Sequence, residues 1–262
     1  LEAAIGRDVL RQEAAIKAVA DAVRVARMRL DPRKDRPSGA FLLTGPTGVG
    51  KTAFAERLAK ALSGRDDALF RIDMSEFSDG HTASRLLGAP PGYIGYDDAP
   101  LLSKAVDACA GGVLLLDEFE KAHAQVHRIF LQILDAGRAT DSTGRTLSFS
   151  GLTIVATCNV GGDAGPALGF LAGTEAAAIA ASGKVPTAAL RRAFPIELLN
   201  RFDAIVPFRA LDRDDARAIL TGAVVRDAND NLRREYGVEL SLTDGAVELL
   251  LAEGYSVELG VR

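Results

Sequence analysis

The sequence predicts an α/β fold, in which helices flank a parallel sheet and a smaller, mostly helical α+β part follows. Short apolar runs at 40–43 and 113–116 have the length of strands buried on both faces of a sheet. Segments with a helical spacing of apolar residues, such as 53–62 and 126–136, alternate with these runs. From residue 211 the alternation ends, and two helical segments enclose one short alternating run. We therefore expect two domains, residues 1–208 and 209–262.

Weaker patterns predict the remaining elements. Apolar spacing predicts one helix over residues 8–30, which the proline-containing linker 31–38 would end. Residues 190–199 have a helical pattern that Pro195 interrupts. Polar residues around Gly144 indicate a hairpin or loop. Further strands are expected at 68–73, 152–159 and 205–208.

The most specific stretch is Gly-Pro-Thr-Gly-Val-Gly-Lys-Thr at residues 45–52. It follows an apolar run and precedes a helical segment, which is the context of a phosphate-binding P-loop. Its glycines let backbone N–H groups turn toward phosphate oxygens, while Lys51 would reach the β- and γ-phosphates and Thr52 would bind Mg²⁺. The alternative is a glycine turn that only joins strand to helix. The predicted nucleotide-binding residues are Thr47, Gly48, Val49, Gly50, Lys51 and Thr52.

Polar groups stand at the ends of two of the predicted strands. Asp117 and Glu118 come after the apolar run 113–116, and Asn159 is the last residue of the predicted strand 152–159. Ligands of open parallel sheets bind at the carboxyl ends of the strands. Asp117 is therefore predicted to bind Mg²⁺ and the nucleotide, and Glu118 to polarise the attacking water. The alternatives are acids that favour a helix start and an asparagine that forms a turn.

Composition excludes several classes of protein. The chain has 262 residues, of which 48% are hydrophobic and 25% charged, as in ordinary globular proteins. A net charge of −4 gives no electrostatic reason to expect nucleic acid, and no apolar run approaches the ~18 residues of a membrane span. The two cysteines lack metal-site spacing, so we expect a reducing, cytoplasmic compartment. Because the chain starts at Leu1, we expect it to be a piece of a longer protein.

The order of these segments resembles one family, the Clp ATPases, which are hexameric AAA+ protein unfoldases. It is most similar to their second ATPase module, as in ClpA, ClpB and ClpC. The resemblance extends from Ile5 to Arg262 and rests on the segments 45–52, 73–77, 81–82, 88–93 and 117–123. It implies an AAA+ P-loop fold, bound ATP or ADP with Mg²⁺, and ATP hydrolysis. The segments 98–100, 157–159 and 195–199 depart from the family pattern, and the small domain would be truncated.

The resemblance also implies roles for single residues. Asn159 is similar to sensor 1, Arg201 to the arginine finger that reaches a neighbouring subunit, and Arg262 to sensor 2; together with Glu118 they form the expected catalytic set. Adenine contacts are implied at Ile5 and Gly6. The loop 85–98 carries Tyr93 and Ile94 at a glycine-flanked tip, the place where the family grips a threaded polypeptide. The alternative for this loop is local packing of its tyrosines on prolines.

Several functions are compatible with these residues. The leading one is ATP-driven unfolding and translocation of unfolded or aggregated polypeptides by a homohexameric ring. Alternatives are a nucleotide-dependent scaffold module without turnover, a Clp ATPase that recycles secretion sheaths, and a nucleic-acid motor, which the acidic balance disfavours. Residues Leu168, Gly169 and Phe170 resemble the tripeptide with which ClpA and ClpC dock on the ClpP peptidase, although three residues can match by chance. The sequence does not indicate which branch of the Clp ATPase family the chain resembles most.

Overall fold

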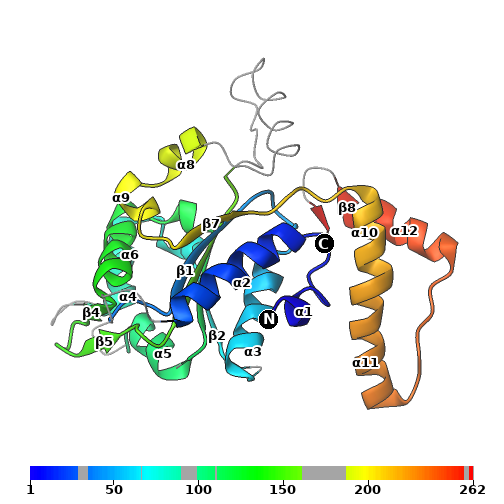
Figure 1. Cartoon of the computed structure of the whole chain (residues 1–262), viewed down its shortest axis with the longest axis horizontal. Helices are drawn as coiled ribbons and strands as arrows, with labels where there is room; N and C mark the ends of the chain where they lie inside the picture. The colour runs from blue at the N-terminus through cyan, green and yellow to red at the C-terminus, as the bar shows by residue number, and fades with distance from the viewer. Residues whose placement is uncertain are drawn as a thin grey trace.

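Figure 1 shows the computed structural model of the chain. The structure describes residues 1–28, 35–65, 67–89, 99–109, 111–160, 187–256 and 260–261. No helix within these ranges is both long and apolar enough to cross a membrane.

A parallel sheet of five strands forms the centre of the fold, in the order β2-β3-β6-β1-β7. Every residue of β1, β3 and β6 is buried, which is why apolar residues dominate these strands and polar ones stand mainly at their ends. The register pairs Asp73 with Asp117 and Thr44 with Cys158, so the carboxyl ends of the strands share one edge. The strands are β1 (Gly39–Thr44), β2 (Leu69–Asp73), β3 (Val113–Asp117), β6 (Thr153–Cys158) and β7 (Ala204–Pro207).

Helices cover both faces of the sheet because alternate residues of its strands point to opposite sides. On β1, Phe41 and Leu43 pack with α2 (Glu13–Arg27) and α3 (Lys51–Ser63), whereas Leu42 packs on the other face with α5 and α6. The α/β fold with a flanked parallel sheet is therefore confirmed. The remaining helices before β7 are α1 (Glu2–Ile5), α4 (Ser84–Leu87), α5 (Leu101–Ala108), α6 (Ala124–Ala136), α8 (Thr187–Ala193) and α9 (Ile196–Leu199), with 3₁₀ turns at Met74–Phe77, Gly80–Ala83 and Phe119–Lys121.

Two sequence predictions are refined by the structure. The helix expected over residues 8–30 begins only at Glu13, because Arg11 adopts a left-handed backbone with φ of 65° and Gln12 is the N-cap. The segment around Gly144 forms a hairpin of β4 (Arg138–Thr140) and β5 (Thr146–Ser148).

The C-terminal part is mostly helical. Helix α10 (Arg213–Ile219) continues through a π-helical turn (Leu220–Val224) into α11 (Val225–Tyr236), and α12 (Asp244–Gly254) follows. A small core of Ala216, Val247 and Leu251 holds α10 to α12. Figure 1 shows α10 and α11 beside α1 and α3, and a short pair, β8 (Tyr255–Ser256) and β9 (Gly260–Val261), near the end of the chain. The domain boundary after residue 208 stays a prediction.

Candidate active site

A pocket of about 470 Å³ lies at the carboxyl edge of the sheet, a size typical of small-molecule sites. Three parts of the chain line it: the P-loop, the ends of β2, β3 and β6, and residues before α2 and after β7. Of the predicted site residues, Thr47 to Thr52, Asp117, Glu118 and Asn159 all line this pocket. The structure thus brings together residues that are more than one hundred positions apart in the chain.

The P-loop owes its shape to glycines with positive φ. Gly45, Gly48 and Gly50 have φ of 140°, 69° and 93°. A Cβ on Gly45 would lie 2.4 Å from the carbonyl oxygen of Phe208, a distance that no side chain tolerates. Gly50 is the N-cap of α3, so the start of this helix and its free N–H groups face the pocket. This is an anion-binding arrangement.

Lys51 places its ammonium group within the P-loop. The residue is only 7% exposed. Its Nζ donates to the carbonyl oxygens of Gly45 and Pro46 at 2.7 and 2.6 Å, and to Oδ1 of Asn159 at 2.9 Å. A buried cation surrounded by oxygen acceptors is suited to a phosphate, which supplies more of the same contacts.

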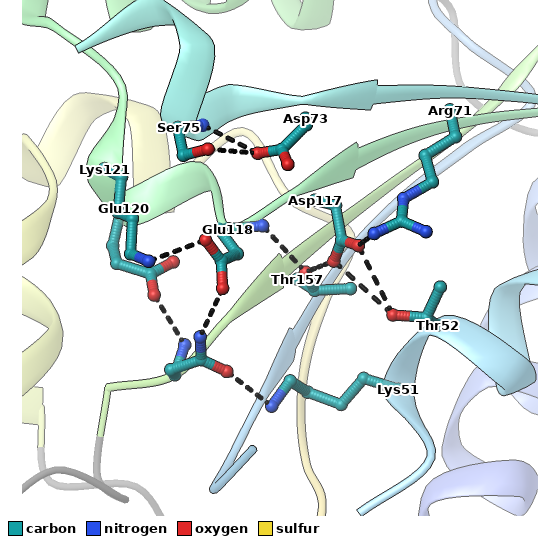
Figure 2. A network of polar contacts seen from close by, with 11 residues as sticks. Lys51, Thr52, Arg71, Asp73, Ser75, Asp117, Glu118, Glu120, Lys121 and Thr157 are labelled. Carbon is teal, nitrogen blue, oxygen red and sulfur yellow. Dashed lines mark hydrogen bonds and ion pairs between the residues drawn. The ribbon is translucent and has the colours of Figure 1, made fainter. Parts of the chain in front are cut away.

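Asp117 is the buried carboxylate of the site, as Figure 2 shows. Its Oδ1 accepts a short hydrogen bond from the Thr157 hydroxyl, and its Oδ2 lies 2.6 Å from Nη2 of Arg71. The Thr52 hydroxyl lies 3.5 Å from both carboxylate oxygens. A hydroxyl and a carboxylate are hard oxygen ligands of the kind that Mg²⁺ uses together with phosphates and water. Thr52 and Asp117 therefore fit the magnesium ion that the resemblance implies.

Glu118 has an unusual backbone for a residue other than glycine. Its φ and ψ are 54° and 46°, and its N–H donates to the Thr157 hydroxyl at 3.0 Å. Such left-handed residues cost about 1–3 kcal/mol and are concentrated at functional sites. The turn aims the carboxylate at Asn159, whose Nδ2 lies 3.5 Å from Oε1, while Lys121 Nζ lies 2.6 Å from Oε2 (Figure 2). A carboxylate held at the rim of the pocket can accept a proton from a bound water.

Three further residues of this network escaped the sequence prediction. Arg71 and Thr157 hold Asp117, as described above. Glu120 accepts the backbone N–H of Asn159 at 3.0 Å, and burial raises the pKa of its carboxyl group. The acidic spacing of residues 117–120 was visible in the sequence as a signal for Glu120. Arg71 and Thr157 gave none, because an arginine or threonine within a strand is ordinary.

The N-terminal lining of the pocket differs from the prediction. Ile5 is fully buried in the core with Ile16, and neither Ile5 nor Gly6 lines the pocket. Asp8, Val9 and Leu10 line it instead, because the chain turns sharply at Arg11 just after them. The apolar wall available for a base is therefore at Val9 and Leu10.

Arg201 lies away from this pocket and does not line it. Its Nε is 2.9 Å from Oδ1 of Asp135, and its carbonyl oxygen accepts a hydrogen bond from Nη2 of Arg36 at 2.7 Å. The other predicted functional residues lie outside the described residues: Tyr93, Ile94, Leu168, Gly169, Phe170 and Arg262.

Comparison with known proteins places this geometry in a family. A model of the AAA domain (Cdc48 subfamily) matches residues 36–205, which is well over half of the chain. The chain belongs to the AAA domain family. The chain is 41% identical over 266 residues to the ATP-dependent Clp protease ATP-binding subunit ClpC of Staphylococcus saprophyticus, and the alignment covers 100% of the chain and 32% of that protein.

Two more relatives give the same result for the chain. It is 42% identical over 264 residues to the probable chaperone protein ClpB 1 of Chlorobaculum tepidum, covering 100% of the chain and 60% of that protein. It is 41% identical over 263 residues to ClpE of Bacillus subtilis, covering 100% of the chain and 37% of that protein. The chain thus spans between a third and three fifths of these relatives. The predicted resemblance to the Clp ATPases is confirmed, and with it a nucleotide-binding AAA ATPase domain.

Proposed function

We propose that this domain hydrolyses ATP in the pocket at the carboxyl edge of the sheet and so powers a ring-forming protein unfoldase. The observation that carries the proposal is the meeting of Lys51, Asp117, Glu118 and Asn159 around one pocket. Hydrolysis needs a phosphate cradle, a metal ligand and a base close together, and these residues supply each of them. A scaffold module without turnover would not need Glu118 on a left-handed turn beside Asn159.

The residues divide the work as follows. Lys51 and the N–H groups of residues 47–52 hold the phosphates, and the side chains of Val9 and Leu10 contact the base. Thr52 and Asp117 hold Mg²⁺, which when bound offsets the negative charge that develops on the phosphate oxygens. Glu118 accepts a proton from the attacking water, and Asn159 orients that water. The water oxygen bonds to the γ-phosphorus as the bond from that phosphorus to the bridging oxygen breaks, which gives ADP and phosphate.

Arg201 acts on the pocket of a neighbouring copy in this proposal. Its side chain is 36% exposed and it does not line its own pocket. An arginine supplied by the next subunit stabilises transition-state charge, so turnover requires a ring. We propose a homohexamer with a large subdomain at 1–208 and a small one at 209–262, in which Arg262 acts as sensor 2.

The substrate in this proposal is an unfolded or aggregated polypeptide, drawn past Tyr93 and Ile94. Relatives named as Clp protease subunits and as ClpB chaperones both support this substrate class. In the form of the proposal in which the protein works with a peptidase, Leu168, Gly169 and Phe170 dock on a ClpP ring. Two free, buried cysteines, Cys109 and Cys158, are compatible with a cytoplasmic location.

The test is Glu118→Gln in the assembled protein, with ATP binding by calorimetry and turnover by phosphate release. We expect unchanged affinity and a turnover lower by about 10²–10⁴-fold, the usual contribution of a general base. The matched control is Glu56→Gln on an exposed position of α3, which should behave as wild type. Near-normal turnover of Glu118→Gln would refute the assignment.

Two additions to the same assay separate the alternatives. Wild type that binds ATP without turning it over would favour the scaffold module. Stimulation by single-stranded DNA, rather than by an unfolded protein such as casein, would favour a nucleic-acid motor. Stimulation by the unfolded protein supports the unfoldase.

A further inference from the structure

A buried glutamine connects the P-loop to the start of the C-terminal part. Gln12 is 3% exposed, and both ends of its amide are engaged. Its Nε2 donates to the carbonyl oxygens of Arg209 and Val49 at 3.0 and 3.4 Å, and its Oε1 accepts the N–H of Arg209 at 3.1 Å. The side chain thus pairs with Arg209 as a neighbouring strand would. It also holds a carbonyl of the loop expected to bind phosphate.

Arg209 extends this contact to α10. Its guanidinium reaches both carboxylate oxygens of Asp215, with Nη2 2.9 Å from Oδ1 and Nη1 2.7 Å from Oδ2. Its Nε also donates to the carbonyl oxygen of Arg11 at 2.9 Å. Asp215 belongs to the capping box at the start of α10 and is 5% exposed. Since two-pronged, charge-assisted pairs fix orientation, the direction of α10 is tied to the backbone at Arg209.

A second set of contacts joins the same two parts at the surface. Asp8 pairs with Arg226 of α11 at 2.5 Å and with Arg57 of α3 at 3.1 Å. These side chains are between 21% and 37% exposed. Exposed ion pairs contribute little to the stability of a fold, typically about 0–1 kcal/mol. Gln12 therefore offers the more rigid connection between the P-loop and the C-terminal part.

We infer that Gln12 is a positioning residue that couples nucleotide binding to the orientation of α10. The path runs from the Val49 carbonyl through the Gln12 amide and Arg209 to Asp215. Nucleotide that orders the P-loop fixes the Val49 carbonyl, and this holds the amide and the backbone of Arg209 in place. Leu211 and Ile219, which also line the pocket, lie on the segment that follows Arg209 and includes α10. The inference rests on the proposed nucleotide binding in this pocket.

The test is hydrogen exchange of the full chain with and without saturating ADP, followed in two peptides, 45–52 and 213–219. In wild type, ADP should slow exchange in both. In Gln12→Met, which keeps side-chain length but lacks the amide, ADP should still protect 45–52. Protection of 213–219 should fall by about fivefold or more, since couplings between sites usually start there. The matched control is Gln132→Leu at an exposed position of α6, which should match wild type.

A purely structural role for Gln12 predicts something else. In that case Gln12→Met would raise hydrogen exchange in both peptides equally, with or without ADP, and the effect of ADP on 213–219 would stay intact. That result would overturn the inference. So would protection of 45–52 alone in wild type. If ADP protects neither peptide in wild type, it is the proposed nucleotide binding that fails.

Arg209→Met gives a second test that does not depend on the folding of the Gln12 variant. This side chain is 40% exposed, and its loss leaves the backbone contacts with Gln12 unchanged. The inferred path predicts that ADP protects 45–52 but no longer protects 213–219. Retained protection of both peptides would contradict the path through Asp215.

Discussion

Replacing Gly45 with alanine should destabilise the fold as well as the P-loop. The new Cβ would lie 2.4 Å from the carbonyl oxygen and 3.2 Å from the Cβ of Phe208. Phe208 has little room to retreat, because it is 2% exposed and its ring packs edge-on against Phe54 of α3 with centroids 5.6 Å apart. Its N–H also donates to the Thr44 carbonyl at 2.7 Å, which continues the pairing of β1 with β7.

The expected cost of this substitution follows from these contacts. Overpacking costs about 1–3 kcal/mol, a residue forced to a φ of 140° costs roughly 1–3 kcal/mol, and a weakened hydrogen bond costs about 1 kcal/mol. We expect a loss of about 3–7 kcal/mol, a large part of the stability of an ordinary domain. The assay is urea unfolding of the full chain followed by circular dichroism.

The control is Gly64→Ala, the same substitution at the C-cap of α3. Gly64 also has a positive φ, 74°, but a Cβ there would meet nothing within 4 Å. Backbone strain alone predicts a loss of about 1–2 kcal/mol. Equal losses for the two variants would show that contact with Phe208 is unimportant and would refute the reasoning.

Three further predictions concern the site. Lys51→Ala should weaken ATP binding by about 3 kcal/mol, or roughly 150-fold, because a buried charge-assisted donor is lost; unchanged affinity in calorimetry would contradict the P-loop assignment. Arg201→Ala should lower kcat by about a thousandfold while ATP still binds. Rings mixed from Arg201→Ala and Glu118→Gln subunits should recover turnover, because some interfaces are then complete, and no recovery would argue against action on a neighbour. Relative to wild type, the Glu120→Gln variant should be most stable at high pH. Burial raises the folded-state pKa of Glu120 above 4.5, so wild type loses stability as pH rises through that pKa. Urea unfolding of wild type and variant at a series of pH values should show that their difference in free energy of unfolding grows above pH 4.5. A difference that does not change with pH would contradict the prediction.

The centre of the fold and much of the site could be predicted from the sequence because their signals are local. A strand buried on both faces is mostly apolar, as β1 and β3 are before their last residue, and a loop that wraps phosphate needs glycine where φ is positive. The acids at the end of β3 follow from the position of strand ends in a parallel sheet. Each of these inferences uses a stretch of about ten residues.

The rest of the site depends on contacts between distant residues or on exceptions to local rules. Arg11 has a φ of 65°. A glycine at this position would have suggested such a conformation, whereas an arginine gives no sign of it in the sequence. The sequence therefore does not indicate that Val9 and Leu10, rather than Ile5 and Gly6, line the pocket. The contact of Gln12 with Arg209 joins positions 197 residues apart, and no periodicity of either segment indicates it.

The unbroken helical run from Arg213 to Tyr236 has a mechanical consequence. At 1.5 Å per residue it is a lever of about 35 Å that is held beside Arg209 and, more weakly, at Arg226, whose exposed ion pair with Asp8 would open if the run turned. A rotation of about 10° at the anchor would carry Tyr236 through about 6 Å, more than the width of a water molecule. A small change of angle at Arg209 would thus become a displacement of several ångström at Tyr236.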